Sequence, residues 1–188
     1  MSEMAELILD DAKERMEKAV VHSREEFATI RSGRANPTLV EKMTVEAYGV
    51  EMRLVEMASI SVPEARQLLI TPHDPSNLEA VERAIRTSDL GLSPSNDGRT
   101  LRLNFPPLTE ERRRELVRIV KKMAEEGRIS IRNIRRDARK ELESAEKEKQ
   151  LTSDELVRAE KDLDRITRSS EATVDGALAS KEEELLEV

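Results

Sequence analysis

The sequence lacks cysteine and tryptophan, and its 188 residues include only two histidines, two phenylalanines and one tyrosine. Without cysteine the chain can form neither a disulfide nor a thiolate metal site, and a reducing intracellular compartment is its natural context. His22 and His73 lie too far apart in sequence to suggest a zinc site. We therefore expect no metal and no resident cofactor.

The signals of catalysis and of membrane insertion are missing as well. The sequence has no glycine-rich phosphate loop and no glycine-flanked serine elbow, and its carboxylates are scattered. No run of about 18 apolar residues is present that could span a membrane. The acidic stretch 1–10 has neither the basic start nor the apolar run of a targeting segment. We expect a cytoplasmic protein that is not an enzyme.

Charge is distributed unevenly along the chain, whose formal net charge is -7. Residues 109–140 contain 12 Lys and Arg against 6 Asp and Glu, which gives this segment a net charge of +6. The remaining residues contain 20 basic and 33 acidic side chains, a net charge of -13. A basic segment within an acidic chain indicates an anionic partner for that segment alone.

Three long segments place apolar or small residues three or four positions apart, which is the period of one helical face. These segments are residues 3–31, residues 109–149 and residues 152–185. The third begins with Thr152 and Glu155, which have the spacing of a capping box. Each of the three helices must bury its apolar face, and a three-helix bundle does this with the fewest additional elements.

The middle of the chain favours strands rather than long helices. Alternating apolar side chains predict strands, the Asp97-Gly98 pair predicts a tight hairpin turn, and the spacing of Leu78, Val81 and Ile85 predicts one short helix. The predicted strands lie at about 43–47, 54–62, 66–71 and 101–105. Residues 33–106 are therefore expected to form a small mixed domain.

The expected fold class is α+β, with a long three-helix bundle and a small β/α/β domain inserted between its first and second helices. The bundle would comprise residues 1–32 and 107–188, and the inserted domain residues 33–106. The two chain crossings between them contain Gly33 and Arg34 on one side and Pro106 and Pro107 on the other. Two crossings of this kind can act as a hinge between domains.

The basic residues of segment 109–140 fall on one side of the predicted helix. At 100° per residue, ten of them lie within about 140° of arc, opposite the apolar residues expected in the core. The ten are Arg114, Arg118, Lys121, Lys122, Arg128, Arg132, Arg135, Arg136, Arg139 and Lys140. We call this set the arginine strip.

The arginine strip has two interpretations, a solvated helix face or a surface that binds RNA. Arginine outnumbers lysine in it, and the planar guanidinium suits bidentate phosphate contacts. Between Arg128 and Lys140 the only acidic residue is Asp137, so we expect the positive charges to be unpaired. Since no aromatic residue lies nearby to stack on bases, RNA would be recognised by its folded backbone.

The end of the first helix also has two compatible interpretations. Arg31 and Gly33 are typical of a helix C-terminus, in which arginine complements the helix dipole and glycine provides a left-handed cap. Arg31 and Arg34 could equally contact an anionic partner.

Three segments resemble the ribosome recycling factor family, and the resemblance spans essentially the whole chain. They are residues 29–37 (TIRSGRANP), residues 106–114 (PPLTEERRR) and residues 131–138 (IRNIRRDA). The shorter segments 61–66 and 88–92 are similar to the family as well. The chain departs from the usual family pattern at Ser32, Ala47, Val50, Glu51 and His73, in or beside the small domain.

The resemblance implies a three-helix bundle with a hinged β/α/β domain, and a function at the end of translation. Such a protein places its bundle along the RNA of the large ribosomal subunit and, with elongation factor G, dissociates the post-termination complex. The partner hydrolyses GTP, so no cofactor is implied for this chain, which would act as a monomer without binding DNA or membranes. The residues implied to contact ribosomal RNA are Arg31, Arg34, Arg113, Arg132, Arg135 and Arg136.

Two other classes of function stay open from the residues themselves. The chain could be a structural bundle whose arginine strip pairs with an acidic protein, or an RNA-modifying enzyme. Salt-sensitive binding to large subunits separates the first from an RNA-binding factor, and turnover by the isolated chain would indicate the second.

Overall fold

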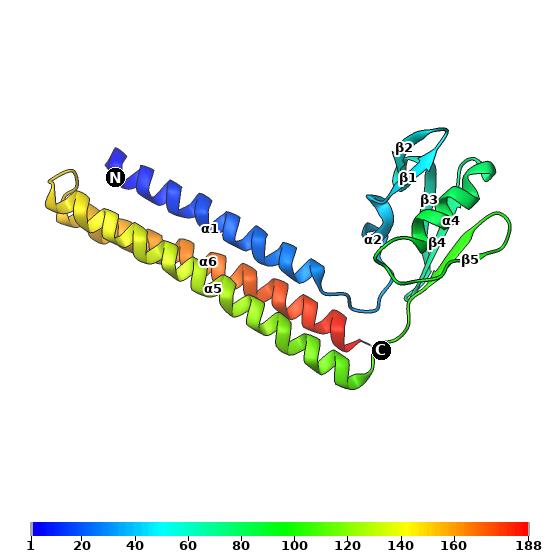
Figure 1. Ribbon diagram of the computed structural model, residues 1–188. Helices are drawn as coiled ribbons and strands as arrows, with labels where there is room; N and C mark the ends of the chain where they lie inside the picture. Colours follow the sequence, from blue (N-terminus) through cyan, green and yellow to red (C-terminus); the bar gives the residue numbers. More distant parts are fainter. Residues whose placement is uncertain (1, 188) are drawn as a thin grey trace. The chain divides into compact units, whose positions relative to one another are not determined.

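The computed structural model describes residues 2–187, and the chain divides into two compact units. The first unit combines Met1–Arg31 with Glu110–Val188, and the second is Ser32–Thr109. The first contains the three long helices and the second contains every strand (Figure 1). The α+β fold class expected from the sequence is confirmed.

The first unit is a bundle of three helices that lie side by side (Figure 1). They are α1 (Glu3–Thr29), α5 (Glu110–Lys147) and α6 (Ser153–Leu186). Ser2 begins α1 by accepting a hydrogen bond from the Ala5 backbone N–H. Thr152 and Glu155 form the predicted capping box at the start of α6. Each helix buries one face, and the largest side chains fully enclosed between them are Met16, Ile131, Leu142, Leu163 and Leu185.

A short turn joins α5 to α6 and makes them antiparallel neighbours. Lys149 adopts a left-handed backbone conformation with φ of 63°, although it is not glycine. The backbone N–H of Lys149 donates to the carbonyl of Glu146, and that of Gln150 donates to the carbonyl of Ala145. This pair of bonds is the Schellman motif, which satisfies the last carbonyls of α5. Leu151 is buried next to the motif and anchors the turn to the bundle.

The second unit contains two antiparallel sheets and one principal helix. Strands β1 (Thr44–Ala47) and β2 (Val50–Arg53) form a hairpin, and the other sheet has the order β3-β4-β6-β5. Helix α4 (Leu78–Arg86) contacts β1 and β4, and its buried residues Leu78, Val81 and Ile85 join the core of this unit. The remaining elements are α2 (Thr38–Glu41), α3 (Leu54–Met57), β3 (Ala58–Glu64), β4 (Gln67–Pro72), the 3₁₀ helix η1 (Pro75–Asn77), β5 (Ser95–Asn96) and β6 (Leu101–Asn104).

Two local expectations for the second unit were wrong. Leu54–Met57 forms a helical turn rather than the start of a strand, because Leu54 and Met57 bury side chains three positions apart while Val55 is exposed. The loop at Asp97-Gly98 is also longer than a two-residue turn, since Asn96 pairs with Leu101. The carboxylate of Asp97 accepts hydrogen bonds from the hydroxyl and from the backbone N–H of Thr100. These bonds, of which the one from the hydroxyl has the larger effect, lower the pKa of Asp97 to about 2.

Candidate nucleic-acid interface

The inner side of α5 fixes the direction in which the arginine strip points. Its buried residues recur every three or four positions and pack against α1 and α6, as the sequence predicted. They are Leu116, Val120, Ala124, Gly127, Ile131, Ile134, Ala138, Leu142 and Ala145. Because this side is held in the core, the opposite side is presented to solvent, together with one apolar residue, the 47% exposed Ile129.

Gly127 marks a close approach of helices α1 and α5. A Cβ atom at this position would lie 2.3 Å from Oγ of the buried Ser23 and 3.8 Å from Cγ1 of Val174. A glycine inside a helix costs roughly 1 kcal/mol relative to alanine, so its presence here is explained by the space it leaves for α1. This contact contributes to the orientation of the strip on the far side of α5.

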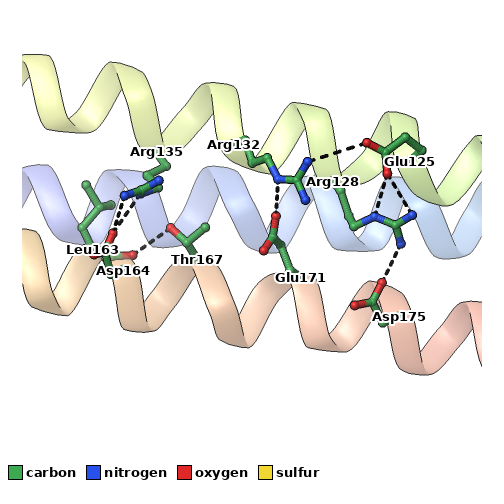
Figure 2. A network of polar contacts seen from close by, with 9 residues as sticks. All are labelled: Glu125, Arg128, Arg132, Arg135, Leu163, Asp164, Thr167, Glu171 and Asp175. Carbon is green, nitrogen blue, oxygen red and sulfur yellow. Dashed lines mark hydrogen bonds and ion pairs between the residues drawn. The ribbon is translucent and has the colours of Figure 1, made fainter.

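One edge of the arginine strip is engaged by acidic side chains of α6 (Figure 2). Arg135 donates from Nε to Oδ1 of Asp164 at 2.8 Å, and its Nη2 lies 2.8 Å from the same oxygen in the ion pair. Arg132 donates from Nε to Oε1 of Glu171 at 2.7 Å. Further along, Nε of Arg139 lies 3.1 Å from Oε1 of Glu160. We call these α5–α6 contacts, together with that of Arg128, the ion-pair ladder.

Arg128 is the most enclosed member of the ladder, with a side chain only 20% exposed. Its Nε and Nη2 face Oε2 of Glu125 at 3.0 and 2.9 Å, and its Nη1 donates to Oδ1 of Asp175 at 2.6 Å. Partial burial alone would lower the pKa of Arg128, but the hydrogen bonds to Glu125 and Asp175 outweigh it and the pKa is raised. Arg128 thus connects α5 to α6 with both edges of its guanidinium occupied.

The expectation that the strip carries unpaired charge was therefore wrong for this edge. Residues 128–140 contain few acidic side chains of their own, but their arginines reach carboxylates outside this stretch. Some of these carboxylates lie on α5 itself, at Glu125 and Glu143, and the others belong to α6. Asp137, the one acidic residue between Arg128 and Lys140, accepts a 3.4 Å hydrogen bond from Arg15 of α1. The acidic residues of α6 were detectable by their spacing, since Glu160, Asp164, Glu171 and Asp175 fall on one helical face.

The other edge of the strip is free. Within residues 2–187, four of its exposed basic side chains have neither a hydrogen-bond nor an ion-pair partner. They are Arg118, Lys122, Arg136 and Lys140, and we call them the free edge. Arg136 adjoins Arg135, so a paired and an unpaired guanidinium emerge from consecutive residues of α5.

The remaining predicted RNA-contact residues are distributed over both units. Arg113, half-buried in the first turns of α5, precedes Arg132 by about 28 Å along the helix. Arg31 is exposed just beyond the end of α1, and Arg34 is exposed in the second unit. Arg132, Arg135 and Arg136 lie within about one turn of each other on α5.

Gly33 does not cap α1 as expected, because the helix ends at Thr29 with Ile30 as its C-cap. It does have a positive φ, of 76°, and a Cβ here would lie 3.3 Å from Cγ of Leu108 and 3.5 Å from the Pro106 carbonyl oxygen. The first and last segments of the second unit therefore lie against each other. Pro106 and Pro107 follow β6 and belong to no helix or strand.

Among residues 2–187 no three His, Asp or Glu side chains are grouped so that they could hold a metal ion. None of the described helices is both long and apolar enough to cross a membrane.

The sequence profile of the ribosome recycling factor family matches residues 23–186, which is most of the chain. The chain belongs to the ribosome recycling factor family. Members are ribosome-binding translation factors of protein biosynthesis that act in ribosome recycling.

Bacterial ribosome recycling factors resemble the chain along its whole length. The factor of Geobacillus sp. strain WCH70 is 51% identical over 185 residues, covering 98% of this chain and 100% of the relative. The factor of Rubrobacter xylanophilus is 52% identical over 180 residues, covering 96% and 97%.

Solved structures of ribosome recycling factors share the fold. A solution structure matches with a TM-score of 0.81 at 38% identity, covering 100% of both chains. The Thermus thermophilus (T. thermophilus) factor, described with Escherichia coli (E. coli) elongation factor G bound to the E. coli post-termination complex, matches with a TM-score of 0.66. It is 42% identical, again covering 100% of both chains.

Proposed function

We propose that this ribosome recycling factor docks the outer side of α5 on the RNA of the large ribosomal subunit after termination. Together with elongation factor G and GTP, it then promotes dissociation of the complex into subunits and release of the messenger RNA. The T. thermophilus factor described with elongation factor G on the post-termination complex is 42% identical over its full length, which supports the same partners here.

The observation that carries this proposal is the arginine strip itself. It gathers ten basic side chains opposite the core of α5, in a chain whose remaining residues are strongly acidic. Arg118, Lys122, Arg136 and Lys140 are exposed and have no partner among the described residues. Phosphate groups release condensed counterions when they meet such side chains, which supplies affinity without any reading of bases.

The proposal gives each predicted residue a role. Arg132, Arg135 and Arg136 would contact phosphates along α5, and Arg113, Arg31 and Arg34 would extend the contact. Base stacking is not required, since Phe27 is buried in the bundle and the other two aromatic residues belong to the second unit. The crossings at Gly33, Arg34, Pro106 and Pro107 would act as the hinge, so stiffening them would slow subunit dissociation while sparing ribosome binding.

The decisive experiment is breakdown of polysomes by the purified chain with elongation factor G and GTP. The Arg132→Ala, Arg135→Ala double variant should bind large subunits at least about tenfold more weakly and lose activity in proportion, because two phosphate contacts are removed. The matched control is Arg158→Ala with Lys161→Ala, which removes two exposed basic side chains of α6 that are not part of the strip. If the arginine variant bound and recycled like the control, RNA docking by α5 would be refuted.

A further inference from the structure

The ion-pair ladder leaves its arginines in unequal states. Arg128 has donors on both edges of its guanidinium engaged, and its side chain is 20% exposed. Arg135 uses only the Nε–Nη2 edge, on Asp164, and is 41% exposed. The end-on Nη1–Nη2 edge of Arg135 therefore keeps two donors that can bind a phosphate bidentately while Asp164 stays in place.

Arg132 is held in a similar way. Its Nε donates to Glu171, and its Nη1 lies 3.6 Å from Oε1 of Glu125, beyond ordinary hydrogen-bond distance. With a side chain 52% exposed, Arg132 keeps both terminal nitrogens available to a ligand. Figure 2 shows Arg132 and Arg135 extending from α5 toward carboxylates of α6, so the bundle itself sets where each guanidinium lies.

We propose that Asp164 and Glu171 are positioning residues that make Arg135 and Arg132 selective for a folded RNA backbone over unstructured polyanions. The inference rests on the proposed function, because it assumes that these arginines meet ribosomal RNA. Each carboxylate has two effects on its arginine. It restricts the side chain to one orientation, and it offsets the positive charge that any polyanion would otherwise sense.

These two effects act in opposite directions on the two kinds of ligand. A flexible single strand is attracted mainly by net positive charge, so the nearby carboxylates weaken its binding. A folded backbone presents phosphates at fixed positions, and it gains from guanidinium groups that are already ordered, because less side-chain entropy is lost on binding. The ladder thus lowers general affinity for polyanions and preserves affinity for a matching surface.

Leu163 and Thr167, near Asp164 on α6, are packed in the core of the bundle. Leu163, next to Asp164, is 1% exposed. The buried hydroxyl of Thr167 donates a hydrogen bond to the Leu163 carbonyl at 2.8 Å. Its hydrogen-bonding requirement is therefore met within α6, and the hydroxyl does not replace Asp164 as the partner of Arg135. Both carboxylates are therefore presented from a packed helix, which is what positioning at this precision requires.

The test compares binding of the full chain to large ribosomal subunits and to poly(U), an unstructured RNA, over a series of salt concentrations. The Asp164→Asn, Glu171→Gln double variant should bind poly(U) roughly three- to tenfold more tightly, with a salt slope steeper by about 1.4 for two uncovered charges on a single strand. Its affinity for large subunits should stay equal or fall. The ratio of the two affinities should therefore drop at least about threefold.

Two further variants separate positioning from general charge and from folding. Glu183→Gln removes one charge from an exposed α6 residue outside the ladder, and it should leave the affinity ratio unchanged. Arg135→Lys keeps the charge but loses the planar fork, so it should weaken binding to large subunits while leaving poly(U) binding unchanged.

The inference is overturned if the double variant leaves the affinity ratio unchanged or raises it, or if Glu183→Gln lowers the ratio equally. Failure of the proposed function looks different, since the Arg132→Ala, Arg135→Ala variant would then bind large subunits normally. Weak binding by that arginine variant, together with an unchanged ratio for the carboxylate variant, would reject only the positioning role.

Discussion

The inner and outer sides of α5 differ in how many kinds of side chain each position can accept. On the inner side, Gly127 faces Ser23 so closely that one added carbon has no room, and neighbours such as Ile131 are completely buried. On the outer side, Arg136 and Lys140 are exposed and form no hydrogen bond or ion pair with any described residue, so we expect that they can be replaced without disturbing the bundle. The ladder lies between these extremes, where Arg128 contributes to the fold and Arg135 still has donors to offer. On this one helix, the residues that stabilise the bundle and the residues proposed to bind RNA thus lie on opposite sides.

The largest expected effect lies on the inner side. Gly127→Ala should lower the free energy of unfolding by about 2 kcal/mol, because the new Cβ collides with Oγ of Ser23. The midpoint of thermal unfolding should fall by roughly 6 °C. Adding Ser23→Ala should restore much of this loss, since the colliding atom is removed.

Gly176 provides the matched control for this prediction. It also lies inside a long helix, but a Cβ there would meet nothing within 4 Å. Gly176→Ala should therefore stabilise the protein by roughly 0.5–1 kcal/mol through helix propensity. Equal effects at the two glycines, measured by thermal or urea unfolding, would show that close approach of α1 does not constrain Gly127.

The second effect concerns the free edge. Arg136→Ala with Lys140→Ala should weaken binding to large subunits roughly tenfold near 0.1 M salt, equivalent to about 1.4 kcal/mol. The magnitude of the salt slope should fall by about 2. The unfolding midpoint should not change, since neither side chain has a hydrogen-bond or ion-pair partner within residues 2–187. A large drop in stability with normal binding would show that these outer side chains contribute to the fold rather than to binding.

The smallest effect is expected at Arg128. Arg128→Ala should reduce the free energy of unfolding by about 1 kcal/mol, because it removes partly enclosed ion pairs and the packing of the arginine stem. Binding to large subunits should change less than about twofold, since both edges of this guanidinium are already occupied. Thermal unfolding and subunit binding measured on the same preparation would check both statements. Strong loss of binding would instead show that Arg128, like Arg135, contributes to binding the large subunit.

Much of this architecture could be predicted because helical periodicity is a local property of the sequence. The positions of Ile131, Ala138 and Leu142 on the inner side followed from their spacing, and Thr152 with Glu155 identified the start of α6. The short helix α3 was missed, because Leu54 and Met57 fit a helical turn as well as the beginning of a strand.

The ladder could not be predicted by the same means. Whether Arg135 meets Asp164 depends on the register between α5 and α6, which the length of their connecting turn and the packing of the core determine together. The tight approach at Gly127 likewise depends on how deeply α1 lies against α5. Both are tertiary properties, and the spacing of acidic residues along α6 was the only trace of the ladder in the sequence.

The contact between Gly33 and the segment of Pro106 and Leu108 has a consequence for the order of folding. The chain must bring α1 onto α5 across the 78 residues of Ser32–Thr109, whereas the α5–α6 hairpin closes through a turn of five residues. Once the second unit has folded, its own two ends already touch, and the loop that α1 must close is short. The entropic cost of that closure falls by about 2 kcal/mol. Folding of the second unit before the bundle is complete would therefore make it easier for α1 to pack against α5.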